Sequence, residues 1–272
     1  MAVQLITDKK IAETSSKGNQ EKWFDSDTNR WYKLDQFGYE GLSETVISVL
    51  LEKSNIETET PFRFVRYRME RLCVHGRERT GCSSENFLKN GEKIITLAHL
   101  LKNEIGDSLT GYLEKLSSDR KRILWIAEKT VEITGLSLFP QYLSLLFETD
   151  ALFLNEDRHL NNIAVLQKDN QYDYCPIFDN GAGLLSNTQI YRMDINPMAQ
   201  IKMVTACPFH TTFNRQVNLV RGLYGAQLRI PKFSDSEIRE VLDPFLSYYP
   251  ERDRGILADR ICRCIIQRQK NK

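Results

Sequence analysis

The pattern of apolar residues predicts that the second half of the chain is mostly helical. Apolar positions recur at helical spacing over 118–134, where Ser118 is placed to cap a helix and Gly135 to end it. The stretch 139–154 is apolar almost all round, which is typical of a buried central helix. Further helices are expected over 213–224, 235–247 and 252–269.

The first part of the chain has the pattern of strands around one helix. Two aromatic-rich runs within residues 22–34 flank a polar turn at 25–29 and predict a β-hairpin. Apolar residues at helical spacing predict a helix near 40–53. Alternation of apolar and basic residues predicts a strand over 61–67, whereas the Gly, Ser and charged residues of 75–93 indicate a loop region.

The character of the chain changes from strand-rich to helix-rich near residues 88–100. We therefore expect an α+β fold with two units, residues 1–90 around a sheet and residues 91–272 mostly helical. A second hairpin, with strands at 163–166 and 174–178, is expected inside the helical unit.

Composition and charge exclude several classes of protein. Lys plus Arg is 37 and Asp plus Glu is 36, so a net charge of +1 gives no whole-chain case for direct nucleic-acid binding. With 41% hydrophobic residues the chain is not disordered throughout, and no apolar run suits a membrane span. Residues 1–10 lack the features of a signal peptide. The six cysteines include no C-x-x-C pair and predict free thiols in a reducing compartment. We expect a cytoplasmic protein, with export to a host by a non-classical route left open.

The chemistry is concentrated in residues 155–185. Asp157 and Asn162 follow the apolar helix, and Asp179 ends the second strand of the expected hairpin, which would bring it beside Asn162. Gly181 would let the chain turn away after Asp179. Phosphoryl transfer needs a carboxylate that accepts the proton of the nucleophile, and oxygen ligands that hold Mg²⁺ against the nucleotide. Each residue alone could also be an ordinary turn or helix-end residue.

The motif D-R-H-x-x-N, followed by I-F-D-N-G, resembles the catalytic and metal-binding loops of HipA-like serine/threonine kinases. These kinases are related to the phosphatidylinositol 3- and 4-kinase-like branch of the protein-kinase superfamily. The resemblance implies a bilobal kinase-like fold, with a strand-rich N-lobe and a larger helical C-lobe, and implies ATP and Mg²⁺ as cofactors. It implies that Asp157 is the catalytic base, that Asn162 and Asp179 are the Mg²⁺ ligands, and that His159 supports the catalytic loop.

The resemblance extends upstream to S-S-K-G-N-Q-E-K, which is similar to the phosphate-binding loop of the family, S-x-x-G-x-Q-x-K. Lys33 then falls on the following strand as the nucleotide-binding lysine, with Glu44, or secondly Glu40, as its ion-pair partner. Alternatives without a functional role stay open. In these, Lys33 is a solvated lysine, Glu44 is a glutamate at a helix start that the helix dipole stabilises, and residues 15–22 are an ordinary segment before the first strand of the hairpin. The loop has a single glycine and no Walker A motif. The residues matched to the loop are Ser15, Ser16, Lys17, Gly18, Gln20 and Lys22.

The function expected from the resemblance is transfer of the γ-phosphate of ATP to Ser or Thr of a protein. Ser15 matches a serine that is autophosphorylated in longer members of the family. Kinase toxins of this kind pair with a small antitoxin or DNA-binding partner, which makes such a partner possible here. A lipid or small-molecule kinase on the same scaffold, and a non-catalytic nucleotide-binding or DNA-associated regulator, are the alternatives. Segment 182–212 is the expected activation segment, with candidate phosphorylation sites at Ser186, Thr188, Thr205 and Thr211.

Overall fold

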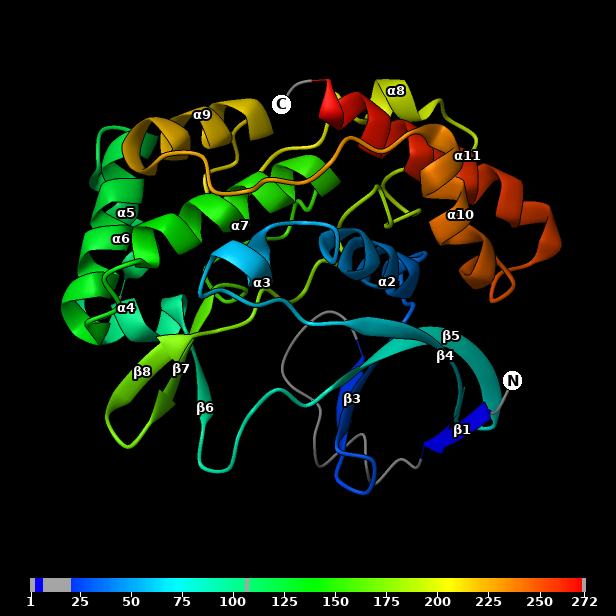
Figure 1. The fold of residues 1–272 in the computed structure, drawn as a ribbon, viewed down its shortest axis with the longest axis horizontal. Coiled ribbons are helices and arrows are strands. Elements are labelled where there is room, and N and C mark those ends of the chain that lie inside the picture. The colour runs from blue at the N-terminus through cyan, green and yellow to red at the C-terminus, as the bar shows by residue number, and fades with distance from the viewer. Residues whose placement is uncertain (1–2, 7–20, 106–107, 271–272) are drawn as a thin grey trace.

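The computed structural model describes residues 3–6, 21–105 and 108–270. A five-stranded sheet in the order β1-β4-β5-β3-β2 forms the N-terminal part (Figure 1). β1 pairs with β4 in parallel, and the other neighbours pair antiparallel. The strands are β1 (Val3–Ile6), β2 (Lys22–Asp25), β3 (Arg30–Leu34), β4 (Tyr67–Val74) and β5 (Arg77–Glu85).

β2 and β3 confirm the predicted hairpin, but two predictions for the same sheet are wrong. β5 lies at the centre of the sheet, where a loop region is expected over 75–93. Its buried residues, Gly-Cys-Ser-Ser at 81–84, are too small and polar to give a strand signal. A Cβ at Gly81 would lie 2.1 Å from the backbone oxygen of Lys33, so the close approach of β3 requires glycine there.

The expected strand over 61–67 is also wrong, because residues 61–66 pair only through an isolated bridge and only Tyr67 belongs to β4. Phe64 bridges Ile177 of the C-terminal part in parallel. The backbone N–H of Val65 donates to the Ile177 oxygen and the N–H of Ile177 donates to the Arg63 oxygen, each at 2.8 Å. The segment therefore links the two parts of the molecule, and the ladder of β4 begins only at Tyr67.

Helix α2 (Glu40–Leu51) confirms the predicted helix and packs between the sheet and the helical part (Figure 1). Leu42, Val46 and Leu50 are buried in one core that continues into the C-terminal helices. Glu40 accepts hydrogen bonds from the backbone N–H groups of residues 37 and 38, which holds the segment before α2 against the first turn of the helix. A short helix, α3 (Ile56–Glu59), follows.

The C-terminal part is mostly helical, as predicted, around a small sheet in the order β6-β7-β8. The side chain of Ser118 accepts from the Lys121 N–H, and Gly135 ends the same helix at φ 72°, so both predicted caps are confirmed. Its elements are β6 (Lys93–Thr96), α4 (Leu97–Ile105), α5 (Leu109–Lys115), α6 (Asp119–Thr134), α7 (Phe139–Phe153), β7 (Ala164–Lys168), β8 (Gln171–Tyr174), α8 (Pro197–Gln200), α9 (Phe213–Tyr224), α10 (Asp235–Leu246) and α11 (Glu251–Gln269).

α7 is the buried central helix that its apolar sequence predicts, and the second hairpin forms from β7 and β8. The prediction of its second strand over 174–178 is wrong, because β8 covers Gln171–Tyr174 and shares only Tyr174 with that range. α4 and α5 were not predicted. No helix within residues 21–105 and 108–270 combines the length and apolar character needed to cross a bilayer. All six cysteines are free thiols, as expected.

The turn between α10 and α11 packs back onto the N-terminal sheet. The hydroxyl of Tyr249 donates to Asp35 Oδ2 at 2.6 Å. Arg71 Nη2 donates to the Ser247 oxygen at 2.9 Å, and the Thr80 hydroxyl donates to the next carbonyl along the turn at 3.0 Å. The end of the helical part therefore contacts β4, β5 and the residue that follows β3.

Asp35 makes the stability of this contact dependent on pH. Burial raises the pKa of Asp35 to about 7, and the charge of Glu40 adds to the shift, while hydrogen bonds from Tyr249 and the Gly41 N–H oppose it. Because the folded-state pKa lies above the ordinary value of 3.8, the contribution of Asp35 to stability is lost as pH rises from about 4 to about 7. Urea unfolding should show the Asp35→Asn variant gaining stability relative to wild type across that range. Asp243→Asn, at an exposed position of α10, is the control, and a constant difference for Asp35→Asn would contradict the assignment.

Candidate active site

Three charged side chains from distant parts of the chain meet beside α2. Lys33 Nζ donates to Glu44 Oε1 at 2.5 Å and to Asp179 Oδ1 at 2.6 Å. β3 supplies the lysine, α2 the glutamate, and the loop after β8 the aspartate. The Glu44 side chain is 0% exposed and that of Lys33 is 11% exposed. The readings of Lys33 as a solvated lysine and of Glu44 as a simple helix-start glutamate are therefore wrong.

Mutual attraction keeps Lys33 and Asp179 ionised although they are buried. Burial on its own would lower the pKa of Lys33, but the charges of Asp179 and Glu44 outweigh it and raise that pKa well above 10.5. Burial would likewise raise the pKa of Asp179, but Lys33 and Lys22 outweigh it and lower that pKa. At neutral pH the site therefore contains an ammonium group and an ionised Asp179.

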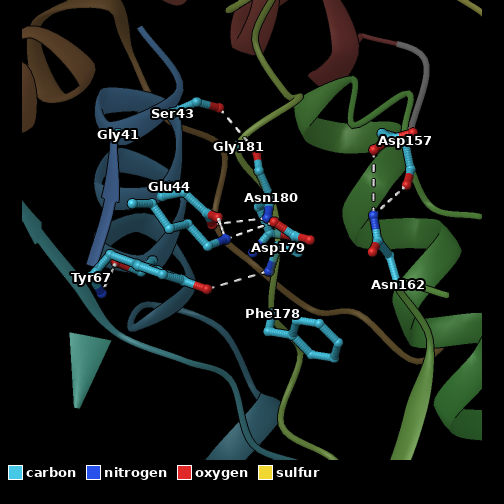
Figure 2. A network of polar contacts seen from close by, with 12 residues as sticks. Gly41, Ser43, Glu44, Tyr67, Asp157, Asn162, Phe178, Asp179, Asn180 and Gly181 are labelled. Carbon is cyan, nitrogen blue, oxygen red and sulfur yellow. Dashed lines mark hydrogen bonds and ion pairs between the residues drawn. The ribbon is translucent and has the colours of Figure 1, made fainter. Parts of the chain in front are cut away.

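The loop that carries Asp179 is held by hydrogen bonds to α2 and β4. The N–H of Asp179 donates to the Tyr67 hydroxyl at 3.3 Å, and the N–H of Asn180 donates to Glu44 Oε2 at 2.8 Å (Figure 2). Asp179 itself adopts φ 62°, a left-handed conformation that is strained for a non-glycine residue. The turn is thus made at Asp179, and the expectation that Gly181 makes it is wrong, since Gly181 has no left-handed φ.

Asp157 and Asn162 lie together on the loop after α7, as the motif predicts. Asn162 Nδ2 donates to the backbone oxygen of Asp157 at 2.9 Å and to its Oδ2 at 3.4 Å. His159 Nε2 lies 3.6 Å from Asp157 Oδ1, so the imidazole is placed to support the carboxylate. Figure 2 shows Asp157 and Asn162 on one side of Asp179, with Glu44 on the other.

The Asp157 carboxylate is accessible, and its pKa is raised. Its side chain is 56% exposed, so a substrate can reach it. Partial burial raises the pKa of Asp157, the charge of Asp179 adds to this, and His159 opposes it. A raised pKa suits a group that must accept a proton.

Arg158, which the sequence analysis did not single out, connects the two loops. Its side chain is 0% exposed and is paired with Asp150 of α7 at 3.0 Å. Nη1 donates to the backbone oxygens of Asn162 at 3.0 Å and Phe178 at 2.5 Å, and Nη2 donates to Asn180 Oδ1 at 2.7 Å. One guanidinium therefore fixes the loop of Asp157 against the loop of Asp179. The available signal was Asp150, an aspartate inside an almost wholly apolar helix.

Asn162 and Asp179 present the amide and carboxylate oxygens that Mg²⁺ prefers. Asn155 holds the loop of Asp179 against α7, because its Nδ2 donates to Asp150 Oδ1 at 2.9 Å and to the Asp179 backbone oxygen at 3.3 Å. Among the described residues no three His, Cys, Asp or Glu side chains form a metal cluster. Two protein ligands completed by phosphate and water oxygens are nevertheless the usual way that proteins hold Mg²⁺ with a nucleotide, so the donor set fits.

An apolar surface borders Asp179 where the chain passes from the N-terminal sheet to the C-terminal part. Phe87, just after β5, packs against Phe178 with ring centroids 6.5 Å apart. The two rings contact one cluster around Val65 and Cys82, and a second around Leu166. The sequence analysis assigned no role to Phe87 or Phe178, because single apolar residues beside a loop give no periodic pattern.

The remaining predicted site residues have different outcomes. Lys22 lies on β2, opposite Lys33 in the ladder. Glu40 accepts from the backbone N–H groups of residues 37 and 38, and its carboxylate is not the partner of Lys33. Ser186 is buried and donates to the Gly181 oxygen, so the prediction that it is a phosphorylation site is wrong. Thr205 is exposed. Five residues of the predicted phosphate loop lie outside the described residues: Ser15, Ser16, Lys17, Gly18 and Gln20.

Comparison with solved structures identifies the fold. The proinflammatory kinase CtkA of Helicobacter pylori matches with a TM-score of 0.60 and 14% sequence identity, over 93% of this chain and 94% of CtkA. This chain shares the CtkA fold. The kinase-like α+β fold expected from the resemblance to HipA-like kinases is thus confirmed.

A second solved structure is HipA of Shewanella oneidensis MR-1, from a toxin–antitoxin complex with HipB and operator DNA. It matches with a TM-score of 0.48 and 11% identity, over 93% of this chain and 64% of HipA. Comparison of the sequence with protein-family models gives no match. Comparison with curated proteins gives none either.

Replacing Arg158 by Met should destabilise the fold strongly. The change leaves Asp150 as a buried, unpaired carboxylate and removes the donors shared by the two loops, which typically costs about 3–5 kcal/mol. Arg239→Met is the control, because it breaks an ion pair to Asp235 on the exposed side of α10 and should cost about 1 kcal/mol or less. Urea unfolding measures both variants, and similar losses in the two would show that Arg158 has no special structural role.

Proposed function

We propose that this protein is an ATP- and Mg²⁺-dependent kinase that transfers the γ-phosphoryl group to Ser or Thr of a protein. The observation that carries the proposal is the contact of Lys33 with both Glu44 and Asp179, beside the paired Asp157 and Asn162. A cation for phosphate, oxygen ligands for a metal and a basic carboxylate are the parts that phosphoryl transfer needs.

In this proposal Lys33 binds the α- and β-phosphates of ATP. Glu44, fully buried and fixed by the Asn180 N–H, holds the ammonium group in place. Asp179 and Asn162 would hold Mg²⁺, which neutralises phosphate charge when bound. The lowered pKa of Asp179 keeps its carboxylate available as a ligand at neutral pH.

Asp157 is the proposed general base. It accepts the proton of the substrate hydroxyl as that oxygen attacks the γ-phosphorus, while the bond from the γ-phosphorus to the β,γ-bridging oxygen breaks and ADP leaves. Its exposed carboxylate and raised pKa suit this step. Asn162 and His159 contact the carboxylate and orient it. We assign His159 this supporting role, as the resemblance implies.

The adenine ring has a suitable apolar surface at Phe87 and Phe178. The loop of residues 15–22 is proposed to cover the phosphates. Lys22 supports this, because its charge lowers the pKa of Asp179.

Four expectations stay predictions. They are autophosphorylation at Ser15, the division of the chain at residue 90, a cytoplasmic location, and a small antitoxin or DNA-binding partner.

Replacement of the proposed base should separate chemistry from binding. Asp157→Asn should lower phosphoryl transfer by about 10²–10⁴-fold, because the general base is lost, while ATP affinity stays close to that of wild type. Asp179→Asn should weaken Mg²⁺-dependent ATP binding, because a ligand is lost. Transfer is measured with γ-labelled ATP and dephosphorylated casein, and affinity by calorimetry with ATP and Mg²⁺; Asp243→Asn, on exposed α10, is the control.

The acceptor that takes up label distinguishes the alternatives. Label on protein supports the proposal, whereas label confined to inositol lipids or sugars would establish a lipid or small-molecule kinase. Binding of ATP without transfer to any acceptor would favour a non-catalytic regulator. Full transfer by Asp157→Asn would overturn the role of Asp157.

A further inference from the structure

Arg260 of α11 is a fully buried cation whose partners are all neutral. Its residue is 1% exposed, and within the described part of the chain it forms no ion pair with a carboxylate. Nε donates to the Tyr39 hydroxyl at 3.0 Å, and Nη2 donates to the Tyr191 oxygen at 2.5 Å. Longer bonds reach the carbonyls of Arg192 at 3.3 Å and Leu185 at 3.4 Å. Burying an arginine in this way is costly, so a role beyond packing is indicated.

The acceptors of Arg260 belong to two segments that the proposed reaction uses. Tyr39 is the N-cap residue of α2, the helix that carries Glu44, and its hydroxyl donates to the Leu184 oxygen at 2.7 Å. The carbonyls belong to the chain that follows Asp179 and that we expect to contact the substrate. We call residues 184–192 the substrate segment. Arg260 thus joins α11, the start of α2 and the substrate segment.

The substrate segment needs such an external support. Leu184 and Leu185 have φ 56° and φ 59°, two consecutive left-handed residues with branched side chains, and this conformation is strained. The carbonyls of both residues accept hydrogen bonds from Tyr39 or Arg260. Further along, the Tyr191 hydroxyl donates to Glu156 Oε2, the neighbour of Asp157.

We propose that Arg260 is a positioning residue, which holds the substrate segment against α2 and the loop of Asp157 so that the protein substrate is aligned. The proposal rests on the kinase function proposed above. Within the described part of the chain, the hydrogen bonds that the Arg260 side chain donates reach none of Lys33, Glu44 and Asp179. Its loss therefore acts on the protein substrate and leaves the binding of ATP nearly unchanged.

The test compares Arg260→Met and Arg260→Lys with Arg263→Met. Arg263 is on the same helix, but it is 48% exposed and paired with Asp259, so it is a matched control. With dephosphorylated casein and γ-labelled ATP, Arg260→Met should lower kcat/KM for casein about tenfold or more, because several charge-assisted hydrogen bonds are lost. The Kd for ATP should change by less than about twofold. Arg260→Lys, which keeps the charge, should recover part of the loss, and Arg263→Met should match wild type.

Hydrogen exchange tests the positioning without requiring turnover. Arg260→Met should speed amide exchange within residues 184–192 and leave exchange in α6 unchanged. Tyr39→Phe is a milder second variant that should give the same pattern if Arg260→Met fails to fold. Unchanged exchange in the substrate segment, or equal losses in ATP affinity and casein turnover, would overturn the proposal. If wild type transfers no phosphate, the proposed function fails, and the exchange pattern alone decides whether Arg260 positions this segment.

Discussion

The burial of one ammonium group between two carboxylates constrains the centre of this molecule. Lys33 cannot be removed from water unless its charge is paired, and its partners Glu44 and Asp179 come from a helix and from a loop of the other part of the chain. The sheet, α2 and the loop after β8 must therefore meet at one point. The close approach of β3 and β5 at Gly81 and the left-handed conformation of Asp179 are the backbone features that allow this meeting.

A second buried cation arranges the other half of the site. Like Lys33, Arg158 is buried and paired with a carboxylate, and its other donors bond two backbone carbonyls and the Asn180 side chain. Lys33 fixes Asp179 relative to the sheet, whereas Arg158 fixes it relative to Asp157 and Asn162. The relative placement of the predicted base and the predicted metal ligands thus depends on two interior charges.

The sequence predicted the elements whose periodicity decides their structure. The hairpin of residues 22–34, α2 and the long C-terminal helices carry strong patterns, and all are present. β5 was missed because it lies against α2 and β3, where small residues fit and large apolar ones do not. The motif residues Asp157, Asn162 and Asp179 were found because their spacing is distinctive. Arg158 and Arg260 were not, because a charged residue in a sequence ordinarily indicates an exposed position and only the three-dimensional neighbours show otherwise.

The docking of the α10–α11 turn onto β4 and β5 has a consequence for biosynthesis. On a ribosome the sheet, α2 and both motif loops emerge before α11 is made. A nascent chain can therefore pair Lys33 with Asp179 while Tyr39 and the substrate segment still lack Arg260. The contacts of Arg260 therefore form only after α11, which follows both motif loops in the chain, has emerged.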